Sequence, residues 1–296
     1  MKIAWKEKFM QGVFFIAACA SVLAVALICV FMFANGIPAI KEIGLFKFLS
    51  GEVWRPSNDI YGILPMIVGS LYVTAGSIIV GVPIGILTSV FMAKYCPKKI
   101  YPLLKSASEL LAGIPSVIYG FFGIMVLVPM VRDGSRFLKS IGAIEQASKG
   151  TSILTASILL GIMILPTIIG VTESALRAVP PAYYEGALAL GATKERSIFA
   201  VVLPAAKSGV VAGIVLGIGR AVGETMAVIM VAGNQPRMPE SIWKGVRTLT
   251  TNIVMEMGYA EGLHREALIA TAVVLFVFIL IINLSVSLLK RRDKNA

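Results

Sequence analysis

Arg220 and Glu224 stand four residues apart near the middle of an apolar run, residues 208–232. A guanidinium can bind an oxyanion through paired hydrogen bonds, and a carboxylate beside it can neutralise it or take up a proton. A charge at the centre of a membrane helix costs about 2.5 to 3.5 kcal/mol on insertion scales. We therefore expect both side chains to face protein or water, not lipid.

Glycines share the helical face of these two charges. At about 100° per residue, Gly209, Gly213 and Gly217 fall on the side of the predicted helix that carries Arg220 and Glu224. Small residues let a neighbouring backbone come close within a membrane. The pattern predicts a packing face, formed with another helix of this chain or with a partner subunit.

Composition indicates what holds these residues in place. The chain is 57% hydrophobic and only 15% charged, which is too apolar for an ordinary soluble domain. Six apolar stretches are long enough to cross a hydrocarbon core of about 30 Å. We expect an all-α polytopic membrane protein, a single transmembrane domain over residues 1–296. The predicted crossings lie near residues 13–34, 66–93, 110–131, 151–172, 208–232 and 267–289.

An even number of crossings places both termini on one side of the membrane. Lysine and arginine counts modestly favour the cytoplasmic side for the termini and for the loop 173–207. The loops 35–65 and 233–266 are then the longest outer segments. We attribute the net charge of +11 to this membrane topology and not to nucleic-acid binding, because no basic run carries the interleaved aromatic residues of a nucleic-acid surface.

The loop 173–207 has more pattern than a linker needs. The prolines at 180–181 suit a helix start, and Gly191 can take the left-handed conformation that ends a helix. Thr193 is a plausible N-cap for a second short helix, which Pro204 would limit. Both helices carry apolar side chains, so we expect them to protrude with a surface to bury against a partner.

Three outer residues, Asn58, Asp59 and Tyr61, are candidates for the outer mouth of a pathway, although turn formation explains the first two equally well. His264 is the only histidine and cannot build a multi-histidine metal site, so we expect it to be solvated or to cap a helix. No metal site is predicted.

The spacing in the inner loop resembles the docking motif of binding-protein-dependent ABC importers. The family carries Glu-Ala-Ala, three residues, Gly, nine residues, Ile, one residue, Leu-Pro in the membrane subunit. This chain departs from it mildly, at Gly186 and Val201. The resemblance implies the type I ABC importer permease fold, and an ATPase subunit that uses ATP and Mg²⁺ while this chain holds no cofactor. The residues that would dock in the ATPase groove are Glu185, Gly186, Ala187, Gly191, Leu203 and Pro204.

Three further strings, residues 54–62, 219–228 and 262–268, are similar to the C-type permease subunits of phosphate-specific importers. The likeness runs from about residue 45 to the end. It implies that the protein lies among the lipids of a bacterial or archaeal cytoplasmic membrane. It also implies three protein partners: an ABC ATPase dimer, a second permease subunit of the A type and an extracytoplasmic phosphate-binding protein. The pathway for inorganic phosphate would be lined by Arg220, Glu224 and Thr225.

Other interpretations remain open. Arg220 and Glu224 could form a permanent ion pair that only fixes helix packing, or Glu224 could accept a proton carried by phosphate. Molybdate or sulfate would suit a buried arginine as well. An ion-coupled secondary transporter could use the same charges but would not need the string 185–204. The chain has neither the Gly-Lys-Ser/Thr element of an ATPase nor the Gly-x-Ser-x-Gly elbow of a hydrolase.

Overall fold

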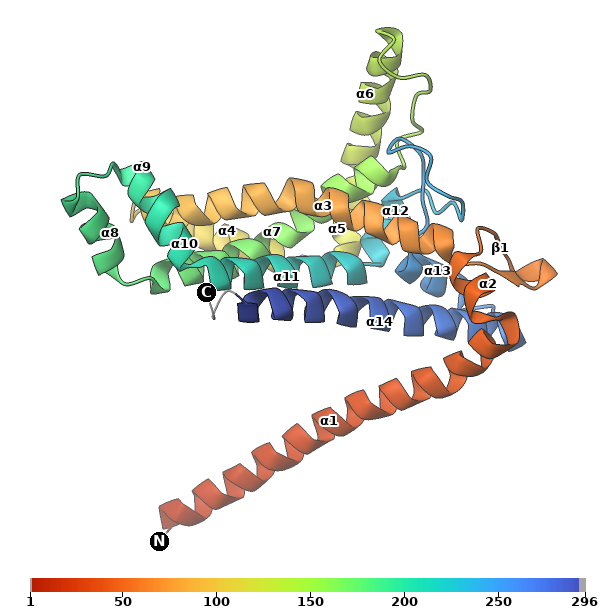
Figure 1. Ribbon diagram of the computed structural model, residues 1–296, viewed down its shortest axis with the longest axis horizontal. Coiled ribbons are helices and arrows are strands. Elements are labelled where there is room, and N and C mark those ends of the chain that lie inside the picture. The colour runs from red at the N-terminus through yellow and green to blue at the C-terminus, as the bar shows by residue number, and fades with distance from the viewer. Residues whose placement is uncertain (1, 293–296) are drawn as a thin grey trace.

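The computed structural model describes the backbone of residues 2–292 and the side chains of residues 6–285. Long helices run side by side between two ends of the molecule (Figure 1). We name these the loop end, which carries α8 and α9, and the hairpin end, which carries the antiparallel strands β1 and β2. The bounds are Pro181–Ala189 for α8, Lys194–Ser197 for α9, Trp54–Arg55 for β1 and Ile60–Tyr61 for β2.

Four predicted crossings correspond to long helices, and each helical segment extends beyond the predicted run at one end or at both. The apolar pattern reports the part of a helix that lies in hydrocarbon, and a helix can continue beyond it into the polar layers. α3 is extended at the loop end by a π-helical segment, η2 (Phe91–Tyr95). The four helices are α1 (Lys2–Ile43), α3 (Leu64–Val90), α7 (Ile153–Ala178) and α14 (Gly262–Arg292).

α7 is the centre of the bundle. Its most apolar window is 67% buried, whereas the windows of the other long helices are at most 33% buried. α3 packs against one side of α7 and α11 (Lys207–Gly223) against another. Gly213 and Gly217 of α11 lie against Thr172 and Ile168 of α7. The predicted glycine packing face is therefore confirmed, and its partner is a helix of the same chain.

The third crossing, predicted over 110–131, lies further along the chain: the helical segment that is long and apolar enough to cross a membrane runs from Ser116 to Ser140. The prediction of one helix that begins at residue 110 is wrong. The chain forms α4 (Tyr101–Gly113), α5 (Ser116–Phe122) and η3 (Gly123–Leu127), with a break at Pro115. Proline lacks an N–H and disfavours helical conformation in the residue before it, and Ile114 is accordingly extended. α6 (Val128–Ser140) continues the helical segment of α5 and η3, and its far end projects from the bundle (Figure 1).

The fifth crossing, predicted as one helix over 208–232, is also interrupted. α11 ends at Gly223, and a separate short helix, α12 (Met226–Val231), follows. At the other side of α11, α9 continues through η4 (Ile198–Val202) and α10 (Leu203–Ala205) and then bends by 71° into α11. The expectation that Pro204 limits the second loop helix is confirmed, because the helical stretch from Lys194 ends at Ala205, one residue beyond the proline.

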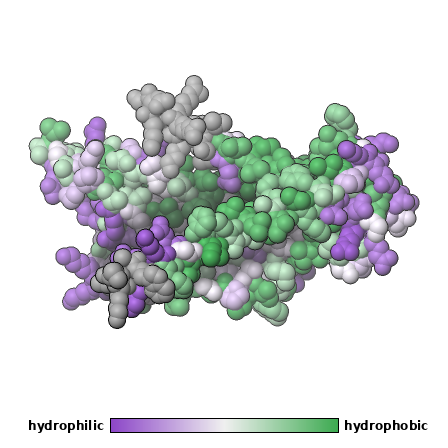
Figure 2. Space-filling model, turned by 90° about the horizontal axis from the view of Figure 1, so that it is seen from below, coloured by the Kyte–Doolittle hydropathy of each residue, from purple (hydrophilic) through white to green (hydrophobic). Residues whose placement is uncertain are grey.

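α1 departs from the bundle. It packs on α14 near the hairpin end, where the rings of Phe33 and Phe276 meet edge to face at 6.0 Å, and then diverges toward its N-terminus (Figure 1). Hydrophobic residues cover the middle of the face seen in Figure 2, and hydrophilic residues gather toward both ends. This distribution is that of a protein whose middle lies in a bilayer.

Candidate functional site

Glu224 lies in the break between α11 and α12, in extended conformation with φ −70° and ψ 131°. Its Oε1 accepts hydrogen bonds from the backbone N–H groups of Thr225 and Ala227, each at 3.2 Å. The carboxylate thus caps the start of α12. The expectation that Arg220 and Glu224 share one face of a continuous helix is wrong, and no ion pair joins them in the described part of the chain.

Arg220 lies in the last turn of α11, where a positive charge suits the carbonyl end of the helix. It forms no hydrogen bond or ion pair with any residue that the structure describes. Leu216 on the neighbouring part of the helix is 54% exposed, and a Cβ added at Gly219 or Gly223 would meet no atom within 4 Å. The guanidinium therefore borders an open face of α11.

Hydroxyl-bearing residues pack beside the break between α11 and α12. Ser70, Thr74 and Thr248 line a cavity of about 10 Å³ together with Glu224. Thr250 donates a hydrogen bond to the carbonyl of Glu224 at 3.1 Å, which brings the start of α13 (Leu249–Glu256) against the break. A cavity of this size holds about one water molecule. The space behind Glu224 is thus closed to a tetrahedral oxyanion in this structure.

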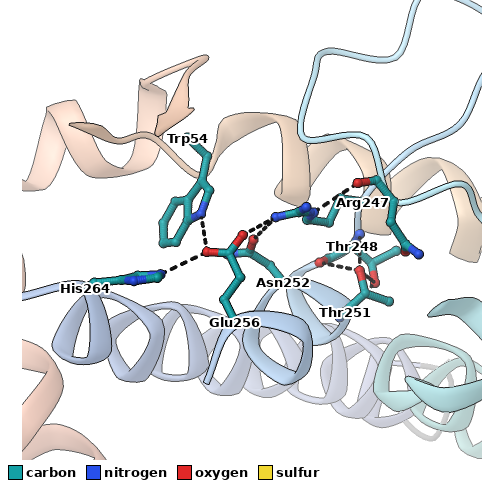
Figure 3. Close-up of polar contacts among 8 residues, drawn as sticks. Trp54, Arg247, Thr248, Thr251, Asn252, Glu256 and His264 are labelled. Carbon is teal, nitrogen blue, oxygen red and sulfur yellow. Dashed lines mark hydrogen bonds and ion pairs between the residues drawn. The ribbon is translucent and has the colours of Figure 1, made fainter. Parts of the chain in front are cut away.

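Glu256 is the centre of a buried polar cluster at the hairpin end (Figure 3). Its Oε2 accepts hydrogen bonds from Trp54 Nε1 at 2.8 Å and His264 Nε2 at 2.9 Å, and its Oε1 accepts one from Arg247 Nη1 at 2.5 Å. Arg247 Nη1 also donates to Asn252 Oδ1 at 3.0 Å. The predicted solvated or capping role of His264 is wrong, because its side chain is only 14% exposed and is bonded to a carboxylate.

This Glu256 cluster connects segments that are far apart in the sequence. Trp54 comes from β1, Glu256 from the end of α13 and His264 from the first turns of α14. Since the other end of α13 touches the break at Glu224, the cluster fixes the helix that covers the break. Sequence reasoning missed Arg247 and Glu256, because no periodicity in an outer loop indicates that its charges are buried.

The outer-mouth candidates form part of the β1–β2 hairpin. Asn58 and Asp59 make its turn, as the alternative reading predicts, with Asp59 left-handed at φ 54°. The Tyr61 hydroxyl donates to Asp59 Oδ1 at 3.2 Å, and burial together with this carboxylate raises the pKa of Tyr61 to about 12. Asp59 and Tyr61 line a surface cavity of about 960 Å³, which Asn58 does not reach.

The loop end carries the predicted docking residues. α8 begins at Pro181, Gly191 is left-handed at φ 82°, and the Thr193 hydroxyl accepts a hydrogen bond from Arg196 N–H at 3.3 Å. The predicted helix ends in the α8–α9 loop, residues 179–197, are therefore confirmed. Leu190 at its tip is 91% exposed, although leucine is usually buried. Glu185, Gly186 and Gly191 are exposed, Ala187 and Leu203 are partly buried, and Pro204 is exposed in α10.

The Glu256 cluster should contribute strongly to stability. Glu256→Gln should lower the free energy of unfolding by about 3 to 5 kcal/mol, because removing one partner of a buried ion pair leaves the Arg247 charge uncompensated. Thermal unfolding of the purified complex measures the effect. Glu240→Gln is the matched control: its pair with Lys244 is exposed, and we expect the change to leave the melting temperature almost unaltered. Equal melting temperatures for the two variants would contradict this assignment.

A membrane-spanning helical bundle with an open arginine and an exposed helical loop at one end is the arrangement of a membrane transport subunit. The chain belongs to the family described as binding-protein-dependent transport system inner membrane component, whose model matches residues 81–294. In this family the permease is a transport subunit, and ATP is hydrolysed by a separate subunit.

Relatives match most of the chain. It is 37% identical over 285 residues to the probable ABC transporter permease protein YqgH of Bacillus subtilis, covering 92% of this chain and 89% of the relative. It is 34% identical to the phosphate transport system permease protein PstC of Mesorhizobium japonicum, covering 86% and 81%. It is 33% identical to the probable phosphate transport system permease protein PstC of Methanocaldococcus jannaschii, covering 87% and 85%.

Solved structures share the fold. A chain of a bacterial alginate ABC transporter, solved with an alginate-bound periplasmic protein, superposes with a TM-score of 0.64 at 17% identity, covering 98% of this chain and 97% of that chain. A chain of the inward-facing MetNI methionine ABC transporter gives 0.60 at 20% identity, covering 81% and 99%. The protein therefore has the type I ABC importer permease fold that its docking motif implied.

Proposed function

We propose that this chain is the permease subunit that forms part of the pathway for inorganic phosphate uptake, driven by ATP hydrolysis in a separate subunit. Phosphate as substrate is supported by relatives that are 33% and 34% identical over more than four fifths of the chain and are named phosphate permeases.

The main observation in support of this pathway is that Arg220 pairs with no described residue. A guanidinium in a membrane helix needs a compensating negative group. Glu224 caps α12 instead, and no other described residue bonds to Arg220. Phosphate is a singly or doubly charged oxyanion near neutral pH, and it can accept paired hydrogen bonds from the guanidinium fork. A passing anion supplies the missing charge.

The open face of α11 beside Arg220 suits the seam with a second permease subunit. Gly219 and Gly223 leave space there, so a facing helix can approach while an anion path remains beside the arginine. We also assign Glu224 and Thr225, which lie at the break directly after α11, to the lining of this pathway. We assign the second subunit as the A-type permease, which makes the transporter a heterodimer in the membrane.

The α8–α9 loop is the proposed contact with an ABC ATPase dimer, which uses ATP and Mg²⁺. The support is its exposed apolar tip and the motif residues Glu185, Gly186 and Gly191 on its surface. This assignment places the loop end and both termini in the cytoplasm. The hairpin end then faces an extracytoplasmic phosphate-binding protein, with Asp59 and Tyr61 beside its surface cavity.

Uptake of labelled phosphate into vesicles that hold all subunits tests the proposal. We expect accumulation that requires ATP inside the vesicles and loaded binding protein outside, and that excess unlabelled sulfate or molybdate does not suppress. Suppression by either competitor, together with its own ATP-driven uptake, would assign that oxyanion as the substrate. Uptake that follows a proton gradient without ATP would contradict the importer assignment.

A further inference from the structure

A buried carboxylate lies near the loop end of α7, shortly before the chain enters the α8–α9 loop. Glu173 is 1% exposed. Its Oε1 accepts hydrogen bonds from the Tyr101 hydroxyl at 2.9 Å and from Arg177 Nε, and its Oε2 accepts one from Lys105 Nζ at 3.0 Å. Each oxygen of this buried carboxylate accepts a hydrogen bond from a cation, so its charge is compensated.

These contacts join three elements at one point. Tyr101 and Lys105 belong to the first turns of α4, and Glu173 belongs to α7. Arg177 Nη2 donates to the carbonyl of Met92 in η2 at 3.1 Å, and its guanidinium lies 4.2 Å from the centre of the Tyr101 ring. This Glu173 cluster therefore ties α4 and η2 to α7.

The same region is packed against the α8–α9 loop and its continuation. Leu176 and Val179 of the α7 end form one apolar cluster with Ile198 and Val202 of η4. Lys194 of α9 lies over the Tyr95 ring of η2, with Nζ at 4.6 Å from the ring centre. Because packed interiors transmit displacement, a movement of the loop must move the end of α7 and η2.

α4 leads from the Glu173 cluster toward the break at Glu224. After the break at Pro115 the chain enters α5, and the Tyr119 hydroxyl donates back across the break to the Leu111 carbonyl at 2.8 Å. Gly120 of α5 lies against Ala227 and Met230 of α12, the helix that Glu224 caps. A displacement of α4 is thus passed to the segment that follows the break.

We infer that Glu173 is a positioning residue that clamps α4 and η2 to α7 and so transmits movement of the α8–α9 loop to the charged break. The inference rests on the proposed function, since it requires the loop to be moved by an ATPase. Charges suit a clamp of this kind, because separating Lys105 or Arg177 from the buried carboxylate removes one of the two positive charges that compensate it. The three elements therefore move as one body.

Glu173→Gln in the complete transporter tests the clamp. The amide keeps one acceptor oxygen, but it removes the negative charge and turns an N–H group toward one of the donors. We expect the phosphate taken up per ATP hydrolysed to fall about tenfold, within the usual range of coupling energies, while basal ATP hydrolysis, measured without binding protein, stays within about twofold of wild type. Stimulation of hydrolysis by loaded binding protein should also be lost.

A second variant separates coupling from folding. Glu173→Gln leaves Lys105 and Arg177 facing each other, so Lys105→Met is added to remove the repulsion while keeping an apolar side chain of similar length. We expect the double variant to recover the wild-type melting temperature of the complex and to remain uncoupled. Glu109→Gln, the same change at an exposed position of α4, is the matched control and should keep wild-type coupling.

Recovery of both stability and the uptake-to-hydrolysis ratio in the double variant would overturn the inference and leave Glu173 a purely structural role. A parallel fall of uptake and basal hydrolysis in the assembled Glu173→Gln complex would overturn it as well. Stimulation of ATP hydrolysis by binding protein can be measured without measuring phosphate uptake, so it tests the clamp separately from the substrate. A wild-type complex that is stimulated but accumulates no phosphate would therefore contradict the proposed substrate alone.

Discussion

Arg220→Gln should lower ATP-driven phosphate uptake by about 10- to 100-fold in vesicles that hold the complete transporter. The substitution removes charge-assisted hydrogen bonds that contribute about 1.5 to 3 kcal/mol, and each 1.4 kcal/mol corresponds to about a tenfold change. Arg220→Lys should retain part of the activity, because it keeps the charge but loses the planar fork. Initial rates of labelled phosphate uptake measure both variants.

Two controls make this result specific. Glu224→Gln should reduce uptake by only about two- to threefold, because an amide oxygen can still accept the N–H groups of Thr225 and Ala227, although more weakly than a carboxylate. Arg237→Gln removes an exposed arginine at the hairpin end and should leave uptake unchanged. Full uptake by Arg220→Gln in an assembled complex would remove the arginine from the pathway.

Leu190→Asp should detach the ATPase from the permease. Burying a leucine side chain contributes about 1.5 to 3 kcal/mol, and a carboxylate in an apolar groove adds an unfavourable desolvation term. Since Leu190 is 91% exposed at the tip of the α8–α9 loop, the change should hardly alter the fold of this chain. We expect the ATPase that copurifies with the tagged permease to fall about tenfold or more, and uptake to fall with it.

Met238→Asp is the matched control for this change. Met238 is an apolar residue, 37% exposed, at the opposite end of the molecule. The variant should therefore retain the ATPase. If Leu190→Asp retained as much ATPase as Met238→Asp, the tip of the loop would not belong to the ATPase contact. The motif residues Glu185 and Gly191 would then have to bind the ATPase without Leu190.

The long helices could be predicted from sequence because length and apolar composition are local properties. The break at Glu224 could not. It contains no proline, and it is stabilised by a carboxylate cap and by a hydrogen bond from Thr250, which lies 26 residues further along the chain. A strong apolar run around the break therefore resembles one unbroken helix until the tertiary contacts are known.

Part of the candidate site could likewise be predicted from the sequence, and part could not. Arg220 stands out because a charge in an apolar run is costly, and the loop helices follow from Pro181, Gly191 and Thr193, whose local conformations agree with their residue types. The Glu256 cluster was not predictable. Its bond between Trp54 and Glu256 joins residues 202 positions apart, and only the fold brings them together.

The most direct test of the account is a structure of the complete transporter, trapped with a non-hydrolysable ATP analogue and phosphate. We expect the α8–α9 loop to be seated in a groove of the ATPase and the Arg220 guanidinium to face anion density at the seam between the two permease subunits. A loop free of any ATPase contact, with Arg220 directed toward acyl chains, would contradict it.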